Sequence, residues 1–224
     1  WNPLMIIPEL SLKTVRSTNL WTMKYFLISL TLLLFGCASF PKKNNLESIS
    51  GHTPTIINPY FSDLAMDYIY KAKINFADKS FGGIFVIKKM GPEHHRVVFT
   101  TEMGNKLFDF SFFKNEFRIN FIPSEMNKKI LINLLRQDLF VLINENPKIL
   151  NQYRKMGDSI FIETKLKNNT YFYLTADERL YKILKTKGNK EKSSYIFAEI
   201  ENDHAKEIKI RHKNIKLTID LKAI

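Results

Sequence analysis

Residues 107–113, LFDFSFF, alternate between apolar and polar side chains with a period of two. In an extended strand this spacing places Phe108, Phe110 and Phe112 on one side. The opposite side then presents polar groups such as Asp109. The stretch therefore predicts a strand with one strongly aromatic face.

The neighbouring stretches repeat this one-sided pattern. Val97 and Phe99 fall on one side of the stretch before it, and Phe117, Ile119 and Phe121 fall on one side of the stretch after it. The chain holds 18 Phe among 224 residues. We therefore expect one face of a sheet to be lined with aromatic and branched side chains.

Short stretches with strand character recur along the chain, and turn signals such as Gly82-Gly83, Gly91-Pro92 and Asn168-Asn169 separate them. The predicted strands cover residues 68–76, 84–88, 95–101, 107–113, 117–122, 159–166, 171–175, 180–186, 194–201, 206–212 and 215–221. About eleven short strands with close turns indicate an antiparallel meander.

One segment breaks the strand pattern. Residues 125–143 lack Gly and Pro, and Ser124 precedes them as a candidate N-cap. Their wide apolar arc includes Leu131, Leu134 and Leu135 and must be buried on more than one side. The predicted fold is mainly β, with one or two helices. It is a curved, antiparallel, half-open β-barrel of about eleven strands that an apolar helix covers.

The space between the helix and the aromatic face has two possible forms. It is either a filled core or a hydrophobic cavity for an acyl chain, and the sequence does not separate them. The candidate lining residues are Val97, Phe99, Phe108, Phe110, Phe112, Phe117, Ile119, Phe121, Leu131, Leu134 and Leu135.

Residues 23–37, MKYFLISLTLLLFGC, have the layout of a secretory signal peptide, with a positive start at Lys24 and a short apolar run. The run is shorter than the ~20 residues of a membrane span. Its end resembles a bacterial lipobox, with cleavage before Cys37 and lipidation of that thiol. The alternative is an uncleaved hydrophobic segment with a chance cysteine. Because Cys37 is the one cysteine of the chain, neither disulfides nor thiol catalysis are expected.

This interpretation divides the chain into four parts. Residues 1–22 are an upstream extension, 23–36 the signal peptide, 37–57 the lipidated cysteine with a flexible tether, and 58–224 the β domain. No aspartate follows Cys37, and in the sorting rule of bacterial lipoproteins this favours the outer membrane. We therefore expect a lipid anchor in the outer membrane and a domain that faces the periplasm.

The chain carries a net charge of +12, and residues 37–224 alone carry +10. In an exported lipoprotein such a surface suits an anionic membrane, whereas a lysine-rich solvated surface is the simpler explanation. Nucleic acid is not an expected partner. We expect a monomer that contacts membrane lipid through its acyl anchor.

The order of elements resembles that of the lipoprotein-carrier family, the periplasmic chaperone LolA and the outer-membrane receptor LolB. Residues 206–224 resemble the closing basic and apolar hairpin of LolB, and residues 95–104 resemble a strand that leads to its protruding leucine. In LolB that leucine enters the membrane. The resemblance implies the same role for Met103, beside Gly104, and an acyl chain or an acylated lipoprotein as cargo.

Signs of catalysis or metal binding are weak. His94 and His95 are adjacent, so on a strand they point to opposite faces. His204 and His212 have no acidic or cysteine ligand at metal spacing in the sequence. We expect no enzyme activity, no metal and no cofactor.

Two hypotheses follow from the sequence. The first is a lipid-anchored outer-membrane lipoprotein that binds an acyl chain or a lipoprotein in a hydrophobic cavity and delivers it to the outer membrane. The second is a structural or scaffold lipoprotein of the cell envelope with a filled core. A cavity of several hundred Å³ would favour the first.

Overall fold

The computed structural model describes residues 25, 39–49, 56, 58–114, 116–155 and 159–224. The chain divides into two units, Trp1–Cys37 and Ala38–Ile224. The predicted signal peptide, Tyr25 excepted, and Cys37 lie outside the described residues. Within the described residues, no helix is both long and apolar enough to cross a membrane.

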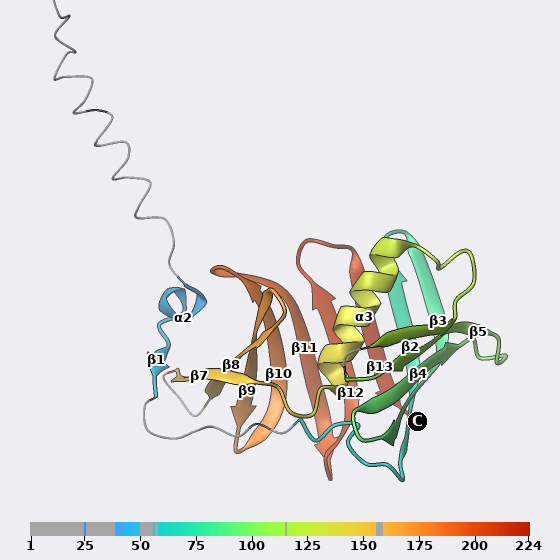
Figure 1. The fold of residues 1–224 in the computed structure, drawn as a ribbon, viewed down its shortest axis with the longest axis horizontal. Helices are drawn as coiled ribbons and strands as arrows, with labels where there is room; N and C mark the ends of the chain where they lie inside the picture. Colours follow the sequence, from blue (N-terminus) through green and yellow to red (C-terminus); the bar gives the residue numbers. More distant parts are fainter. Residues whose placement is uncertain (1–24, 26–38, 50–55, 57, 115, 156–158) are drawn as a thin grey trace, which may run out of the picture. The chain divides into compact units, whose positions relative to one another are not determined.

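Two antiparallel meanders form one sheet, and helix α3 (Lys129–Ile143) connects them (Figure 1). The first meander comprises β2 (Asp67–Phe76), β3 (Lys79–Gly91), β4 (His94–Thr100), β5 (Lys106–Phe112) and β6 (Phe117–Phe121). The second comprises β7 (Ile149–Arg154), β8 (Ile160–Leu166), β9 (Asn169–Ala176), β10 (Arg179–Lys187), β11 (Lys190–Glu201), β12 (His204–His212) and β13 (Leu217–Ala223).

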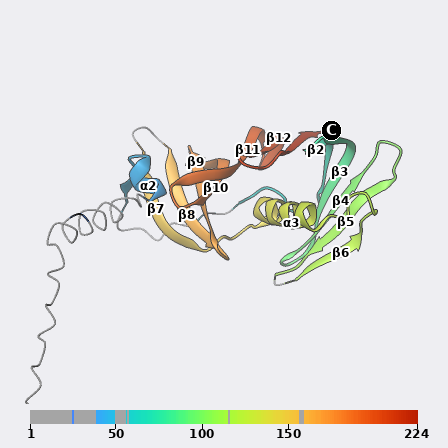
Figure 2. The same ribbon diagram turned by 90° about the horizontal axis from the view of Figure 1, so that it is seen from above.

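The last strand joins the two meanders by pairing with the first strand of the other, β13 with β2. The strand order is β1-β7-β8-β9-β10-β11-β12-β13-β2-β3-β4-β5-β6, in which β1 is Glu47–Ser48. The sheet is therefore open, with β1 and β6 at its edges. Figure 2 shows α3 in the hollow of this curved sheet. The predicted fold class is confirmed, with thirteen strands among the described residues instead of about eleven.

Helix α3 begins later than predicted, at Lys129, and its N-cap residue is Lys128. The predicted N-cap Ser124 is wrong, because it lies in a turn in which the amide of Asn127 bonds to the carbonyl oxygens of Pro123 and Ser124. At the other end, buried Asn58 donates from Nδ2 to the carbonyl oxygen of Leu142 at 2.7 Å. This bond satisfies one of the carbonyl groups that a helix end leaves unpaired.

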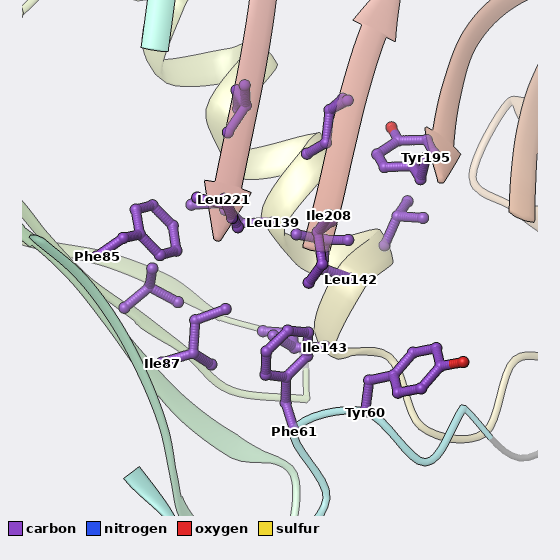
Figure 3. Close-up of a cluster of buried hydrophobic side chains, with 14 of the residues drawn as sticks. Tyr60, Phe61, Phe85, Ile87, Leu139, Leu142, Ile143, Tyr195, Ile208 and Leu221 are labelled. Atoms are coloured by element: carbon purple, nitrogen blue, oxygen red, sulfur yellow. The ribbon is translucent and has the colours of Figure 1, made fainter. Parts of the chain in front are cut away.

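The space under the helix is filled by a continuous core. Phe85, Phe99, Phe108 and Phe110 are fully buried, and the stacked rings of Phe108 and Phe110 lie 4.5 Å apart. Figure 3 shows Leu139, Leu142 and Ile143 of α3 beside Phe85 and Ile87 of β3 and Ile208 of β12. Burying a phenylalanine side chain stabilises a fold by roughly 2 kcal/mol. The filled form of the interior is thus observed beneath the helix.

The backbones of β3 and β4 come too close at Gly83 to leave room for a side chain. A Cβ atom on Gly83 would lie 1.8 Å from the carbonyl oxygen of Thr100, so only glycine permits this approach. A side chain at Gly83 would therefore force β3 and β4 apart at this point.

Part of the predicted tether is structured. Helix α2 (Phe40–Lys43) places Phe40, 7% exposed, on Phe172 with ring centroids 4.7 Å apart. Strand β1 pairs with β7, and Ile49 donates its amide to the carbonyl oxygen of Gln152 at 2.9 Å. The segment expected to be free therefore covers a second, smaller core with Phe161, Leu174 and Leu184.

Candidate functional site

A cavity of about 630 Å³ lies at the C-terminal end of α3. One side is formed by β4 and β5, and the other by β8 and β9. Six strands separate β4 from β9 in the sheet order, so the curvature of the sheet brings the two sides together. The last turn of α3, which ends at Ile143, contributes Phe140, Val141 and Ile143 to the lining.

The inner wall of the cavity is largely apolar. Phe112, Val141, Ile143, Tyr171 and Tyr173 line it, and each is at most 4% exposed. Burial raises the pKa of both tyrosine hydroxyl groups, so they stay neutral at physiological pH. This wall can bury an apolar ligand without exposing it to charge.

The rim of the cavity is charged. The Glu93 carboxylate is 3.0 Å from the Lys114 ammonium group, and that of Glu145 is 2.8 Å from Lys89. Lys148 and Lys165, both exposed, also line the cavity. An apolar wall beside a charged rim suits a ligand that has one apolar part and one polar part.

His95 closes one side of the cavity and is 4% exposed. Its Nε2 lies 2.9 Å from the carbonyl oxygen of Phe61 and 3.6 Å from Glu145 Oε1. Burial lowers the pKa of His95, although the bond to Phe61 and the charge of Glu145 oppose this shift. The ring is therefore neutral at pH 7, and with its proton on Nε2 it donates to the Phe61 carbonyl.

Of the residues predicted to line a cavity, Phe112 alone lines this one. The others fall into two groups. The buried core contains Val97, Phe99, Phe108, Phe110, Leu131 and Leu135, while Phe117 and Leu134 are half-buried and Ile119 and Phe121 are 40% and 43% exposed. Ile119 and Phe121 are exposed because β6 is the edge of the open sheet, and no strand of the described residues lies beyond it.

The sequence interpretation did not single out the wall residues Val141, Ile143, Tyr171 and Tyr173. Tyr171 and Tyr173 alternate along β9 and share one face, a pattern equivalent to that of the phenylalanines of β5. That alternation was the available signal. It does not by itself indicate that the end of α3 leaves space in front of these side chains.

The hairpin that joins β4 to β5 presents Met103 at its tip, 92% exposed. Gly104 has a φ of +84°, and its amide bonds to the carbonyl oxygen of Thr101 at 2.9 Å. On one flank, Glu102 forms an ion pair with Lys71 at 3.1 Å. The hairpin thus holds a flexible apolar side chain fully in solvent, an arrangement that suits contact with a membrane.

A polar network that sequence reasoning missed lies between α3 and the second meander. Asp138 is fully buried and accepts hydrogen bonds from the Tyr195 hydroxyl group at 2.7 Å and from His212 Nε2 at 2.8 Å. His212 therefore does have an acidic partner, 74 residues away in the sequence. Among the described residues, no group of three or more His, Cys, Asp or Glu side chains is placed to hold a metal ion.

The open antiparallel sheet around a covering helix is a LolA-like fold. The structure is similar to the crystal structure of a LolA superfamily protein from Nitrosomonas europaea, with a TM-score of 0.51 and 9% sequence identity. The similarity covers 75% of this chain and 87% of that one. No protein-family model and no curated protein matches the sequence. At this identity the likeness establishes the fold.

Proposed function

We propose that this chain is a lipid-anchored envelope protein that binds the acyl chain of a lipid or lipoprotein and helps deliver it to the outer membrane. It acts as a binding protein and not as an enzyme. The observation that carries this proposal is the apolar-walled cavity of about 630 Å³ in a LolA-like fold. Its volume lies within the ~300–1,000 Å³ that is usual for ligand cavities.

Three parts of the chain serve three steps: anchoring, binding and release. Cys37, as the acylated first residue of the mature protein, anchors the domain to the membrane. The wall around Val141 and Tyr173 holds the acyl chain. Met103, at the exposed tip of its hairpin, enters the bilayer when the ligand is released.

The loading step is tested by filling the cavity. The full chain with Cys37→Ser, which cannot be acylated at that position, is purified and its lipids are identified by mass spectrometry. We expect bound lipid, and at least a tenfold loss when Val141→Trp fills the wall. Overpacking costs roughly 1–3 kcal/mol, so thermal unfolding must confirm that this variant is folded. Leu150→Trp, at a 46% exposed position outside the cavity, is the matched control.

The release step is tested in the same preparation with vesicles as acceptor. Met103→Glu should slow transfer of bound lipid to vesicles roughly tenfold, because a carboxylate resists entry into the bilayer. Met90→Glu, at another exposed methionine, should transfer normally. Equal transfer rates for both variants would remove Met103 from the proposal.

A structural role in an envelope complex is the second candidate, and the filled core beneath α3 favours it. A scaffold with a solid interior needs no ligand. Absence of lipid from the protein, together with failure to take up added lipid, would support this role and contradict the carrier.

A further inference from the structure

The rim of the cavity carries positive charge that acidic neighbours do not neutralise. Three lysines and two glutamates line it. Both glutamates already have partners, since Glu93 pairs with Lys114 and Glu145 pairs with Lys89, which lies just outside the lining. The acidic side chains of the rim are therefore neutralised.

The remaining two lysines are not engaged in this way. Lys148 and Lys165 are exposed, and among the described residues no ion pair or side-chain hydrogen bond includes either of them. Lys148 follows Pro147 in the loop after α3, and Lys165 lies in β8. Both contribute to the same cavity as the apolar wall, so cationic and apolar surfaces meet there.

We propose that the cavity binds an amphiphile with an anionic headgroup, which Lys148 and Lys165 hold at the rim while its acyl chain lies against Val141 and Tyr173. This inference rests on the proposed function and adds to it the charge class of the ligand. A phosphate and a carboxylate share the chemistry that two ammonium groups recognise. Glu93 and Glu145 are already paired, so they do not compete with the ligand's anionic group for Lys148 and Lys165.

Charge at the rim should determine which headgroup is preferred, and should contribute little to the affinity that all lipids share. The acyl chain supplies the apolar burial, which is the same for any headgroup. Attraction of an anionic lipid by basic side chains near a surface predicts roughly a tenfold preference for two lysines, after allowance for solvent exposure. The preference should shrink as the salt concentration rises, because exposed charges are screened.

The experiment uses the full chain with Cys37→Ser and two fluorescent probes with identical acyl chains, phosphatidylglycerol and phosphatidylcholine. We expect roughly tenfold tighter binding of phosphatidylglycerol. Lys148→Gln combined with Lys165→Gln should bring the two affinities together by weakening phosphatidylglycerol alone. Lys187→Gln combined with Lys190→Gln, at exposed positions of the β10–β11 hairpin outside the cavity, should leave the preference intact.

Competition separates the sources of the anion. Palmitate should displace the phosphatidylglycerol probe, whereas inorganic phosphate at the same concentration should not. Displacement by inorganic phosphate would show an ion site without a chain and would overturn the inference. Equal affinity for both probes would also overturn the inference, as would a preference that persists in the Lys148 and Lys165 variant. Neither result would contradict the proposed lipid-carrier function. Failure of both probes to bind would contradict the proposed function itself.

Discussion

The two sides of helix α3 meet the sheet through different kinds of contact. Toward the first meander, a chain of aromatic rings runs across β4, β5 and β6, with Phe110 and Phe117 centroids 5.2 Å apart, and Arg136 of α3 lies over the Phe117 ring. Toward the second meander, α3 is hydrogen-bonded, with Asp138 bound to Tyr195 and Gln137 accepting from Lys185 at 2.8 Å.

The two kinds of contact have different effects on α3: one stabilises its packing on the sheet, and the other fixes its position. Apolar packing is strong but has no fixed direction. A buried carboxylate that accepts two hydrogen bonds is satisfied in one arrangement only, and the low dielectric around it makes any other arrangement costly. We infer that packing on the aromatic side stabilises α3 against the sheet, while the hydrogen bonds of Asp138 fix its position along β11 and β12.

The largest expected effect is on the aromatic side. Phe108→Ala removes a fully buried ring that contacts Phe85, Phe99 and Phe110, and should lower the free energy of unfolding by about 4 kcal/mol. Phe121→Ala, at a 43% exposed edge position, should cost about 1 kcal/mol or less. Urea unfolding measures both values. Similar losses for the two variants would show that the rings of β5 do not form the stabilising side.

The next effect is on the polar side. Asp138→Ala leaves the Tyr195 hydroxyl group buried without its acceptor and should cost about 3 kcal/mol. Asp138→Asn keeps one acceptor oxygen and should cost less. Because Asp138 fixes the position of the helix, hydrogen exchange of the α3 amides should accelerate more in Asp138→Ala than in an equally destabilised core variant. Unchanged relative protection would contradict the positioning role.

The smallest effect is a pH dependence from His95, which lies at the edge of the aromatic side. Burial lowers its pKa in the folded protein, so the unfolded chain takes up a proton first as the pH falls. The His95 contribution to stability is therefore complete above the unfolded pKa of about 6.5 and decreases as the pH falls below it. Urea midpoints at about pH 8 and about pH 5.5 should differ less in His95→Gln than in the unchanged chain. Burial also lowers the pKa of His204. The His204→Gln variant therefore separates the contribution of His204 to the pH dependence from that of His95.

Much of the first meander could be predicted because its information is local. The period of two that places Phe108, Phe110 and Phe112 inward holds in the structure, where all three are at most 3% exposed. The same rule fails at Ile119 and Phe121, because their exposure depends on whether another strand lies beyond β6. A sequence pattern predicts which face of a strand a side chain lies on, but not whether that strand is at the edge of the sheet.

The polar network and the cavity depend on contacts between distant residues. Asp138 finds Tyr195 across 57 residues and His212 across 74, and no local spacing signals either pair. The cavity depends on where α3 stops in relation to β8 and β9, which packing decides. Strand β7 was missed because its inward and outward residues do not alternate clearly between apolar and polar.

The pairing of β13 with β2 has a kinetic consequence. Asn75 and Thr218 bond across this junction at 2.9 Å although they are 143 residues apart in the sequence. A chain that emerges from its N-terminus makes β2 early but completes the sheet only when its last segment arrives. The entropy lost in closing such a long loop is compensated only when the β13–β2 contacts form. Folding is therefore slow, typically milliseconds to seconds. Until then the open edge of β2 is free to pair with other chains, so the interval before β13 docks is the period of greatest aggregation risk.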